Sequence, residues 1–222
     1  MALTISESGG GTFEQAPKGN HNATCYRLVD VGTHSETFEG ETKQSIFIYW
    51  ELNDAKMEDG RPYTIFKQYT LSLNEKSALY KDLCAWRKKQ FTDEERKGFD
   101  LTNILGMTCE LAIGETKTGN SKVVNVFAPD GGAQKQPTVN EQVAFDIDEY
   151  IAGDKDMIGV WVDLPAWVQT KIDDSFEAKA KDTAREQGNS NQFDSLESLN
   201  ESQEDKPFPS DDDQEEMDKL PF

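Results

Sequence analysis

The chain has 222 residues, with 23 Lys+Arg against 42 Asp+Glu, a formal net charge of −19 and 36% hydrophobic residues. That length suits one domain with appendages or two small domains, and no apolar run approaches the roughly 18 residues of a membrane span. Met1 to Gly11 has no basic stretch followed by an apolar one, so we expect no secretory signal. The cysteines Cys25, Cys84 and Cys109 are odd in number and widely spaced, which argues against a disulfide framework or cysteine-rich zinc site and indicates a reducing, cytoplasmic setting.

The acidic residues are distributed unevenly. Residues 1–128 carry 15 Lys+Arg and 18 Asp+Glu, whereas residues 129–222 carry 8 and 24. From about Lys181 the chain is rich in Ser, Asn, Gln, Asp and Glu, and too few apolar residues follow to offset an ordering entropy of about 1–2 kcal/mol per residue. We therefore expect a flexible arm (1–20), a folded domain (21–128), an extension with a helix (129–180) and a disordered acidic tail (181–222).

Three strands are predicted first, over Thr24 to Val31, Ser45 to Leu52 and Tyr63 to Thr70. Alternation in the second strand places Ile46, Ile48, Trp50 and Leu52 on one face, and Phe47, Tyr49 and Glu51 on the other. In the third strand, the same alternation places Tyr63, Ile65, Lys67 and Tyr69 on one face.

A helix is predicted next, opened by a capping box at Ser72 and Glu75 and packed through Leu79, Leu83 and Trp86. A short helix over 92–95 and strands over 107–114 and 122–128 follow. Three strands, a helix and two strands match the five-stranded oligonucleotide-binding barrel (OB-fold), so the predicted fold is mainly β. The extension is expected to contribute a strand over 143–150 and a helix from Pro165, giving a small α/β appendage.

Aromatic and basic residues are interleaved along the predicted barrel. Single-stranded nucleic acid requires ring faces for its bases and cations for its phosphates, and stacking is worth about 1–3 kcal/mol per base. The predicted nucleic-acid-binding residues are Arg27, Phe47, Tyr49, Arg61, Tyr63, Lys67, Tyr69, Arg87, Lys88, Lys89, Lys117 and Lys122. Any one of these rings can instead fill the barrel, and Trp50 and Trp86 are assigned to the core.

The chain ends in an acidic stretch followed by Leu220, Pro221 and Phe222, and apolar terminal residues add nothing to solubility. This tip resembles that of bacterial and phage single-stranded DNA-binding proteins, and Trp50 to Leu52, Tyr69 to Ser77 and Trp86–Arg87 resemble phage-encoded replication proteins with this barrel. The resemblance implies that Pro221 and Phe222 anchor the tip in a pocket of replication or recombination enzymes. The residues implied for partner binding are Asp211, Asp212, Asp213, Glu215, Glu216, Asp218, Leu220, Pro221 and Phe222. Lys219 and Leu220 depart from the family's pattern, and Pro207–Phe208 is a second copy of the dipeptide or a coincidence.

Enzyme signals are poor. There is no nucleotide-binding glycine loop, no nucleophile signature and no His–Cys ligand spacing, so we expect neither an enzyme nor a cofactor or metal. The carboxylates between Asp146 and Asp156 imitate a metal cluster and are interpreted as part of the acidic second half.

The leading hypothesis is a protein that coats single-stranded DNA largely without sequence preference during phage replication, recombination or repair. The alternative is an acidic interaction or DNA-mimic protein that binds a basic host enzyme, with the barrel as scaffold. The sequence neither requires nor excludes a homo-oligomer, and it does not decide between DNA and RNA.

Overall fold

The computed structural model describes residues 14–35, 41–181 and 183. The chain divides into two compact units, residues 1–179 and 180–222, and every helix and strand named below lies in the first. The predicted disordered tail and the docking tip lie outside the described residues. Within the described part, no helix is long and apolar enough to cross a membrane.

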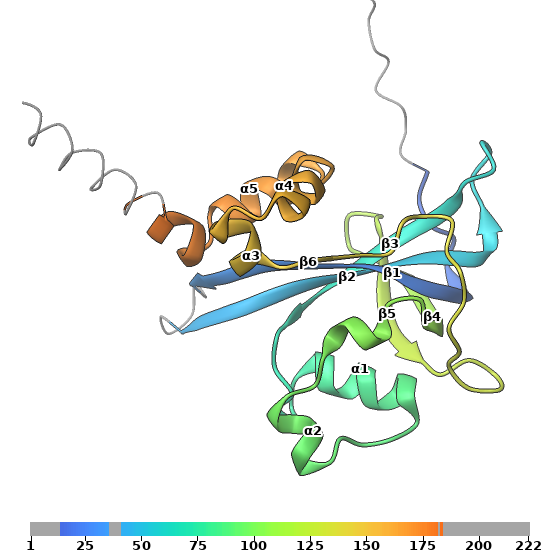
Figure 1. Ribbon diagram of the computed structural model, residues 1–222. Coiled ribbons are helices and arrows are strands. Elements are labelled where there is room, and N and C mark those ends of the chain that lie inside the picture. The colour runs from blue at the N-terminus through green and yellow to red at the C-terminus, as the bar shows by residue number, and fades with distance from the viewer. Residues whose placement is uncertain (1–13, 36–40, 182, 184–222) are drawn as a thin grey trace, which may run out of the picture. The chain divides into compact units, whose positions relative to one another are not determined.

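The first unit is built on a six-stranded sheet in the order β3-β2-β1-β4-β5, with β6 beside β1 (Figure 1). The strands are β1 (Gly19–Ser35), β2 (Thr42–Lys56), β3 (Pro62–Thr70), β4 (Thr108–Glu115), β5 (Ser121–Phe127) and β6 (Val143–Phe145). All pairs are antiparallel except β1 with β6. The predicted mainly β fold, with three strands, a helical segment and two strands in that order, is confirmed.

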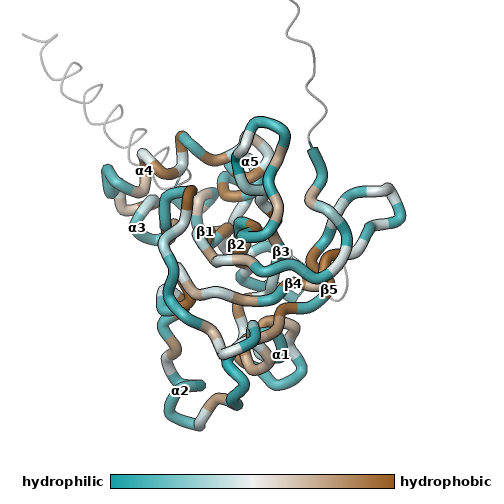
Figure 2. Tube along the Cα trace, turned by 90° about the vertical axis from the view of Figure 1, so that its right-hand side faces the viewer, coloured by the Kyte–Doolittle hydropathy of each residue, from teal (hydrophilic) through white to brown (hydrophobic). Residues whose placement is uncertain are grey.

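Helices occupy the two long connections. Between β3 and β4 lie α1 (Ala78–Arg87), α2 (Asp93–Lys97) and a 3-10 turn (Leu101–Ile104), and after β6 come α3 (Ile147–Ala152), α4 (Lys155–Val162) and α5 (Ala166–Asp173). In Figures 1 and 2 the sheet lies between α1 and α2 on one side and α3 to α5 on the other. Each face of the sheet is therefore covered by a helical segment from a different part of the chain.

The strand β1 pairs with β2 along one edge, and its other edge is shared by β4, at residues 19–24, and β6, at residues 27–29. Its register with β2 shifts at Tyr26, which is a bulge between the pairs Cys25–Trp50 and Arg27–Tyr49. A bulge bends a strand and increases its twist. The end strands β3 and β5 approach each other, and the Lys67 Nζ donates to the Val124 carbonyl at 3.2 Å.

The expected closed five-stranded barrel is not formed. Among the described residues no ladder joins β3 to β5, so the sheet remains open between them. The sequence order of strands agrees with a barrel, but closure depends on backbone hydrogen bonds between its two end strands.

Two hydrophobic clusters pack against opposite faces of the sheet. The first contains Trp50 and the rest of its predicted face together with Leu83 and Trp86 of α1, so both tryptophans belong to the core as predicted. The second contains Phe47 and Tyr49 with side chains from β1, β6, α3 and α5. The extension thus covers much of the face that was expected to be open.

The extension packs closely against β1 at Gly32. The φ of this glycine is +77°, and an added Cβ would lie 2.6 Å from the Ser175 Cβ and 2.7 Å from the Ile147 Cδ1. The next amide, that of Thr33, donates to the Glu177 carboxylate at 2.9 Å. A side chain at position 32 would separate the end of α5 from β1.

Two predicted boundaries are wrong. The helix α1 begins after Ser77, whose side chain accepts from the Tyr80 amide, while the Ser72 hydroxyl accepts from the Asn74 amide in a local turn. The strand expected over 143–150 ends at Phe145, because the Asp146 carboxylate caps α3. The short helix after Thr92 and the helix after Pro165 are present as predicted, and the former begins with a capping box between Thr92 and Glu95.

Candidate nucleic-acid interface

A groove of about 760 Å³ runs across the face of β2 and β3 that carries Tyr49, between the β4–β5 turn and α5. Four aromatic side chains line it, namely Tyr26, Tyr49, Phe66 and Trp167. Three basic side chains, Arg27, Lys67 and Lys122, line it as well, against the single carboxylate of Glu14. The groove therefore combines rings and cations in a chain whose total charge is strongly negative.

Phe66 and Trp167 present the open ring surface of the groove. Phe66 is 39% exposed and Trp167 is 48% exposed. Their ring centroids lie 5.2 Å apart, with 33° between the ring planes. The rings of Tyr49 and Phe47 pack against Phe66, at 5.2 and 5.4 Å, and are buried by it. Bases can stack on Phe66 and Trp167, whereas the predicted rings Phe47 and Tyr49 support this surface from below.

The sequence missed Phe66, Trp167 and Tyr26. Phe66 is opposite Tyr49 in the ladder of β2 and β3, so the two share a face. Alternation along β3 already separates Thr64, Phe66 and Gln68 from Tyr63 and Tyr69. It does not give the register with β2, which decides which of these two sets shares a face with Tyr49. Trp167 belongs to α5, and no pattern within the strand sequences indicates that this helix packs on the sheet.

Tyr63 and Tyr69 lie on the opposite face and do not line the groove. Tyr69 is buried in the first cluster and donates to the Asp82 carboxylate of α1 at 2.7 Å. Burial and the neighbouring Asp82 raise the pKa of Tyr69. Tyr63 packs against the same cluster and donates to Glu14 at 3.0 Å. Tyr63 and Tyr69 therefore have structural contacts and lie outside the groove, because alternation along residues 63 to 69 places both side chains on the same face as Ile65, toward the core.

The three cations of the groove differ in their surroundings. Lys67 pairs with Asp82 at 2.7 Å and bridges β3 to β5 through Val124. Arg27 lies over the Tyr26 ring, with its Cζ 5.7 Å from the centroid. Lys122 is exposed, and no ion pair joins it or Arg27 to another described residue. Because salt screens electrostatic interactions beyond about 8–10 Å, the potential in the groove depends mainly on these local charges.

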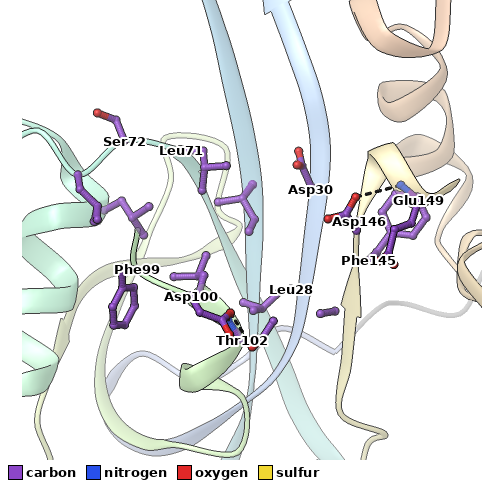
Figure 3. A pocket seen from close by; sticks show the side chains of 15 residues that line it. Leu28, Asp30, Leu71, Ser72, Phe99, Asp100, Thr102, Phe145, Asp146 and Glu149 are labelled. Atoms are coloured by element: carbon purple, nitrogen blue, oxygen red, sulfur yellow. Dashed lines mark hydrogen bonds between the residues drawn. The ribbon is translucent and has the colours of Figure 1, made fainter. Parts of the chain in front are cut away.

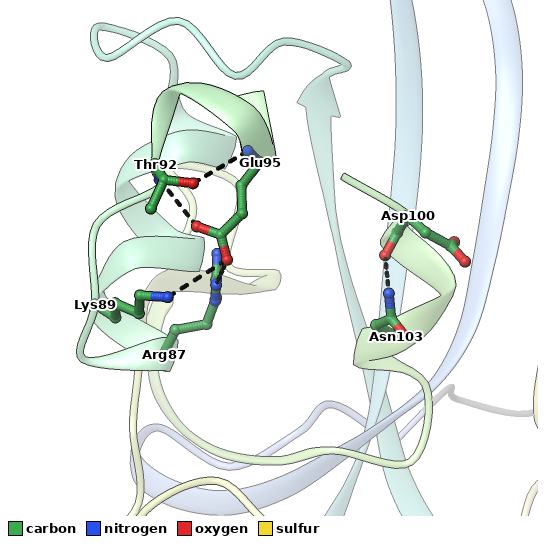
Figure 4. Close-up of polar contacts among 6 residues, drawn as sticks. All are labelled: Arg87, Lys89, Thr92, Glu95, Asp100 and Asn103. Atoms are coloured by element: carbon green, nitrogen blue, oxygen red, sulfur yellow. Dashed lines mark hydrogen bonds and ion pairs between the residues drawn. The ribbon is translucent and has the colours of Figure 1, made fainter. Parts of the chain in front are cut away.

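The basic run Arg87, Lys88 and Lys89 is not part of the groove. Arg87 and Lys89 both pair with Glu95, at 2.5 and 3.6 Å, and thereby join α1 to α2 (Figure 4). The Thr92 amide, then Arg87, lowers the pKa of Glu95 to about 2. Lys88 ends α1 in the left-handed region, at φ 51°. Sequence proximity suggested a cation patch, but the fold uses two of these side chains as internal ion pairs.

The remaining predicted cations lie at turns. Arg61 pairs with Asp59 at 2.6 Å, two residues away. Lys117 is exposed in the turn between β4 and β5, where its neighbours Thr116 and Asn120 reach the groove. Of the twelve predicted residues, the structure brings four into the groove: Arg27, Tyr49, Lys67 and Lys122.

A second cavity, of about 550 Å³, lies between the segment around the 3-10 turn and α3 (Figure 3). It is lined by apolar side chains and by the carboxylates of Asp30, Asp100, Asp146 and Glu149, with no Lys, Arg or His. Burial raises the pKa of Asp30. Its charge makes this cavity unsuited to a phosphate chain, in contrast to the groove.

Two of the acidic residues between 146 and 156, Asp146 and Asp154, serve as helix caps. The Asp146 carboxylate accepts from the amides of Asp148 and Glu149 at 2.9 and 3.1 Å. Asp154 does the same at the start of α4. Among the described residues no three His, Cys, Asp or Glu side chains are grouped as metal ligands. The resemblance of this run to a metal cluster thus has a local explanation in helix capping.

The predicted partner-binding residues, from Asp211 to Phe222, lie outside the described residues. No protein-family model matches the chain, and no curated protein matches its sequence.

Proposed function

We propose that this chain is a phage-encoded protein that coats single-stranded DNA, largely without sequence preference, during replication, recombination or repair in the host cytoplasm. The observation that carries the proposal is the groove, which combines the open rings of Phe66 and Trp167 with Arg27, Lys67 and Lys122. Stacking on such rings is tolerant of base identity, and a cationic groove follows the phosphate chain.

The fold is proposed to be a variant of the OB-fold with an open seam. The meander β1-β2-β3, the helix α1 before β4, and the pairing of β1 with both β2 and β4 all support this assignment. OB-folds bind oligonucleotides on the face of the second and third strands, flanked by the loop between the fourth and fifth. The groove occupies the same place, on β2 and β3 beside the β4–β5 turn.

The net charge of −19 is compatible with DNA binding because two cations that line the groove, Arg27 and Lys122, have no ion-pair partner among the described residues, while Lys67 is paired with Asp82. Residues 181–222 carry much of the chain's excess acid and are proposed to compete with DNA for the groove. The terminal Pro221 and Phe222, with the acidic residues before them, are proposed to dock on replication or recombination enzymes.

Fluorescence titration with oligo-dT tests the proposal. Full-length protein and residues 1–180 are titrated at two salt concentrations, with quenching of aromatic emission as the signal. We expect both proteins to bind with a negative salt slope, and the truncated protein to bind more tightly, with the larger gain at low salt because salt also weakens the competition by the tail. Negligible binding by residues 1–180 contradicts the proposal and favours an acidic interaction protein. Equal binding by the two proteins rejects only the competition by the tail.

A further inference from the structure

Arg27 and Tyr49 are direct partners in the ladder of β1 and β2, at the position where the bulge at Tyr26 shifts the register. Without the bulge, consecutive side chains of β1 would point to opposite faces. With it, Tyr26 and Arg27 both line the groove, beside Tyr49. Bulges occur often where a strand must direct a side chain into a site.

Two polar atoms in this part of the groove have no partner. The Tyr49 hydroxyl and the Arg27 Nε are buried, and neither forms a hydrogen bond with any described residue. Tyr49 as a whole is 8% exposed. Buried polar groups in native proteins nearly always have partners, so each exception requires an explanation. Other buried side-chain atoms of the described residues also have no partner, but only these two belong to residues that line the groove, where a ligand can be the missing partner.

We propose that the Arg27 Nε–H and the Tyr49 hydroxyl, which belong to residues that line the groove but are closed to solvent in the unbound protein, become a pair of hydrogen-bond donors to an oxygen acceptor of the bound single strand. The acceptor is a carbonyl oxygen of a base or an oxygen of a backbone phosphate. This inference rests on the proposed DNA-binding function. It gives Tyr49 a different role from stacking, since the Phe66 ring lies 5.2 Å away and covers it.

The chemistry of both groups favours an oxygen acceptor. A guanidinium has donors only, and a phenol can donate while it remains protonated. Burial raises the pKa of Tyr49, so its hydroxyl keeps its proton at neutral pH. Arg27 also has no carboxylate partner among the described residues, which leaves its charge available to an incoming oxygen.

The test is the variant Tyr49→Phe in the full-length protein, which removes the hydroxyl and retains the ring. Its affinity is measured for oligo-dT, for oligo-dA and for an abasic oligomer of equal length. The control is Tyr80→Phe. Tyr80 lies in α1, its hydroxyl accepts from Arg96 at 3.1 Å, and it does not line the groove. We expect Tyr49→Phe to weaken oligo-dT binding about five-fold, the effect of one lost hydrogen bond, and Tyr80→Phe to leave it unchanged.

The three oligomers distinguish the acceptors. Equal loss on all of them identifies a phosphate oxygen, and loss on oligo-dT alone identifies a base oxygen, because adenine has no carbonyl group. Loss on oligo-dT and oligo-dA but not on the abasic oligomer would mean that the acceptor is not an oxygen, and would overturn the inference. If Tyr49→Phe binds all three like the wild type, the inference is overturned while the binding function stands. If the wild type itself fails to bind oligo-dT, the proposed function fails first.

A second variant and a melting curve distinguish a lost contact with DNA from a loss of folding. Arg27→Lys retains the charge but lacks the Nε donor, so it should weaken oligo-dT binding without changing the salt slope. Because the unbound protein leaves the Tyr49 hydroxyl unsatisfied, Tyr49→Phe should not lower the melting temperature. A clear fall in melting temperature would show that the hydroxyl has a partner within the protein, and would overturn the inference.

Discussion

The rings of Tyr49 and Phe66 lie 5.2 Å apart because the two residues are paired across β2 and β3. Trp167 of α5 also packs against Phe66, with the ring centroids 5.2 Å apart. One aromatic surface is therefore assembled from two adjacent strands and from a helix roughly 100 residues further along the chain. The extension after β5 is thus a part of the proposed binding site.

Removing the open rings should weaken DNA binding. We expect Phe66→Ala and Trp167→Ala each to cost about 1–3 kcal/mol of binding free energy, or roughly 5-fold to 150-fold in affinity, because each loses one stacked base. Binding is measured by anisotropy of a labelled oligo-dT, which does not depend on Trp167 as the fluorophore.

The matched control for these variants is Phe127→Ala. Phe127 is 41% exposed on β5 but does not line the groove. We expect it to bind oligo-dT like the wild type. If Phe127→Ala weakens binding as much as Phe66→Ala, the effect comes from general loss of apolar surface, and the assignment of the groove is wrong.

The faces of β2 could be predicted because alternation alone separates Trp50 from Tyr49, and the two lie in different clusters as expected. Their exposure could not be predicted in the same way. Phe47 is buried by Phe66 and Trp167, one from a neighbouring strand and one from a distant helix. A single sequence gives the faces of a strand, but not the register or the layer that covers it.

The charged residues show the same limit. Arg87, Lys88 and Lys89 are adjacent in sequence, yet Glu95 engages two of them. Lys122, by contrast, was predicted from its place at the start of a strand, and it does line the groove. Ion pairs of this kind depend on where the next helix begins, and in the structure a capping box between Thr92 and Glu95 fixes that position.

Reversing the charge of Lys122 should weaken binding through the phosphates. Lys122→Glu should lower oligo-dT affinity at low salt and reduce the magnitude of the salt slope by about 1, because one phosphate contact is lost. The control is Lys76→Glu, an exposed lysine before α1 that does not line the groove. Titrations at four salt concentrations give the slopes, and identical slopes for the two variants contradict a specific role for Lys122.

The variant Tyr69→Phe should separate stability from binding. The Tyr69 hydroxyl donates to Oδ2 of Asp82, and the same oxygen accepts from Lys67. Loss of a hydrogen bond to a charged group should lower the free energy of unfolding by about 1.5–3 kcal/mol. Because Tyr69 lies on the core face, oligo-dT affinity at a temperature where the variant is folded should be unchanged. A loss of affinity without a loss of stability would show that Tyr69 contributes to DNA binding.

The buried Glu51 should hold the segment before β6 against β2. Its side chain accepts from the amides of Val139 and Asn140 at 2.8 and 2.9 Å, and from the Asn140 Nδ2 at 2.7 Å. Glu51→Gln replaces one accepting oxygen by a donor that faces these N–H groups, and should lower the free energy of unfolding by about 1–3 kcal/mol. Urea unfolding measures the change.

The control for Glu51→Gln is Glu58→Gln, at an exposed position after β2. This substitution should leave the unfolding midpoint unchanged, since no buried N–H group depends on that side chain. The segment held by Glu51 leads through β6 to α5, which carries Trp167. Glu51→Gln should therefore also make residues 139–142 exchange their amide hydrogens faster, and unaltered exchange there would mean that other contacts hold this segment to the sheet.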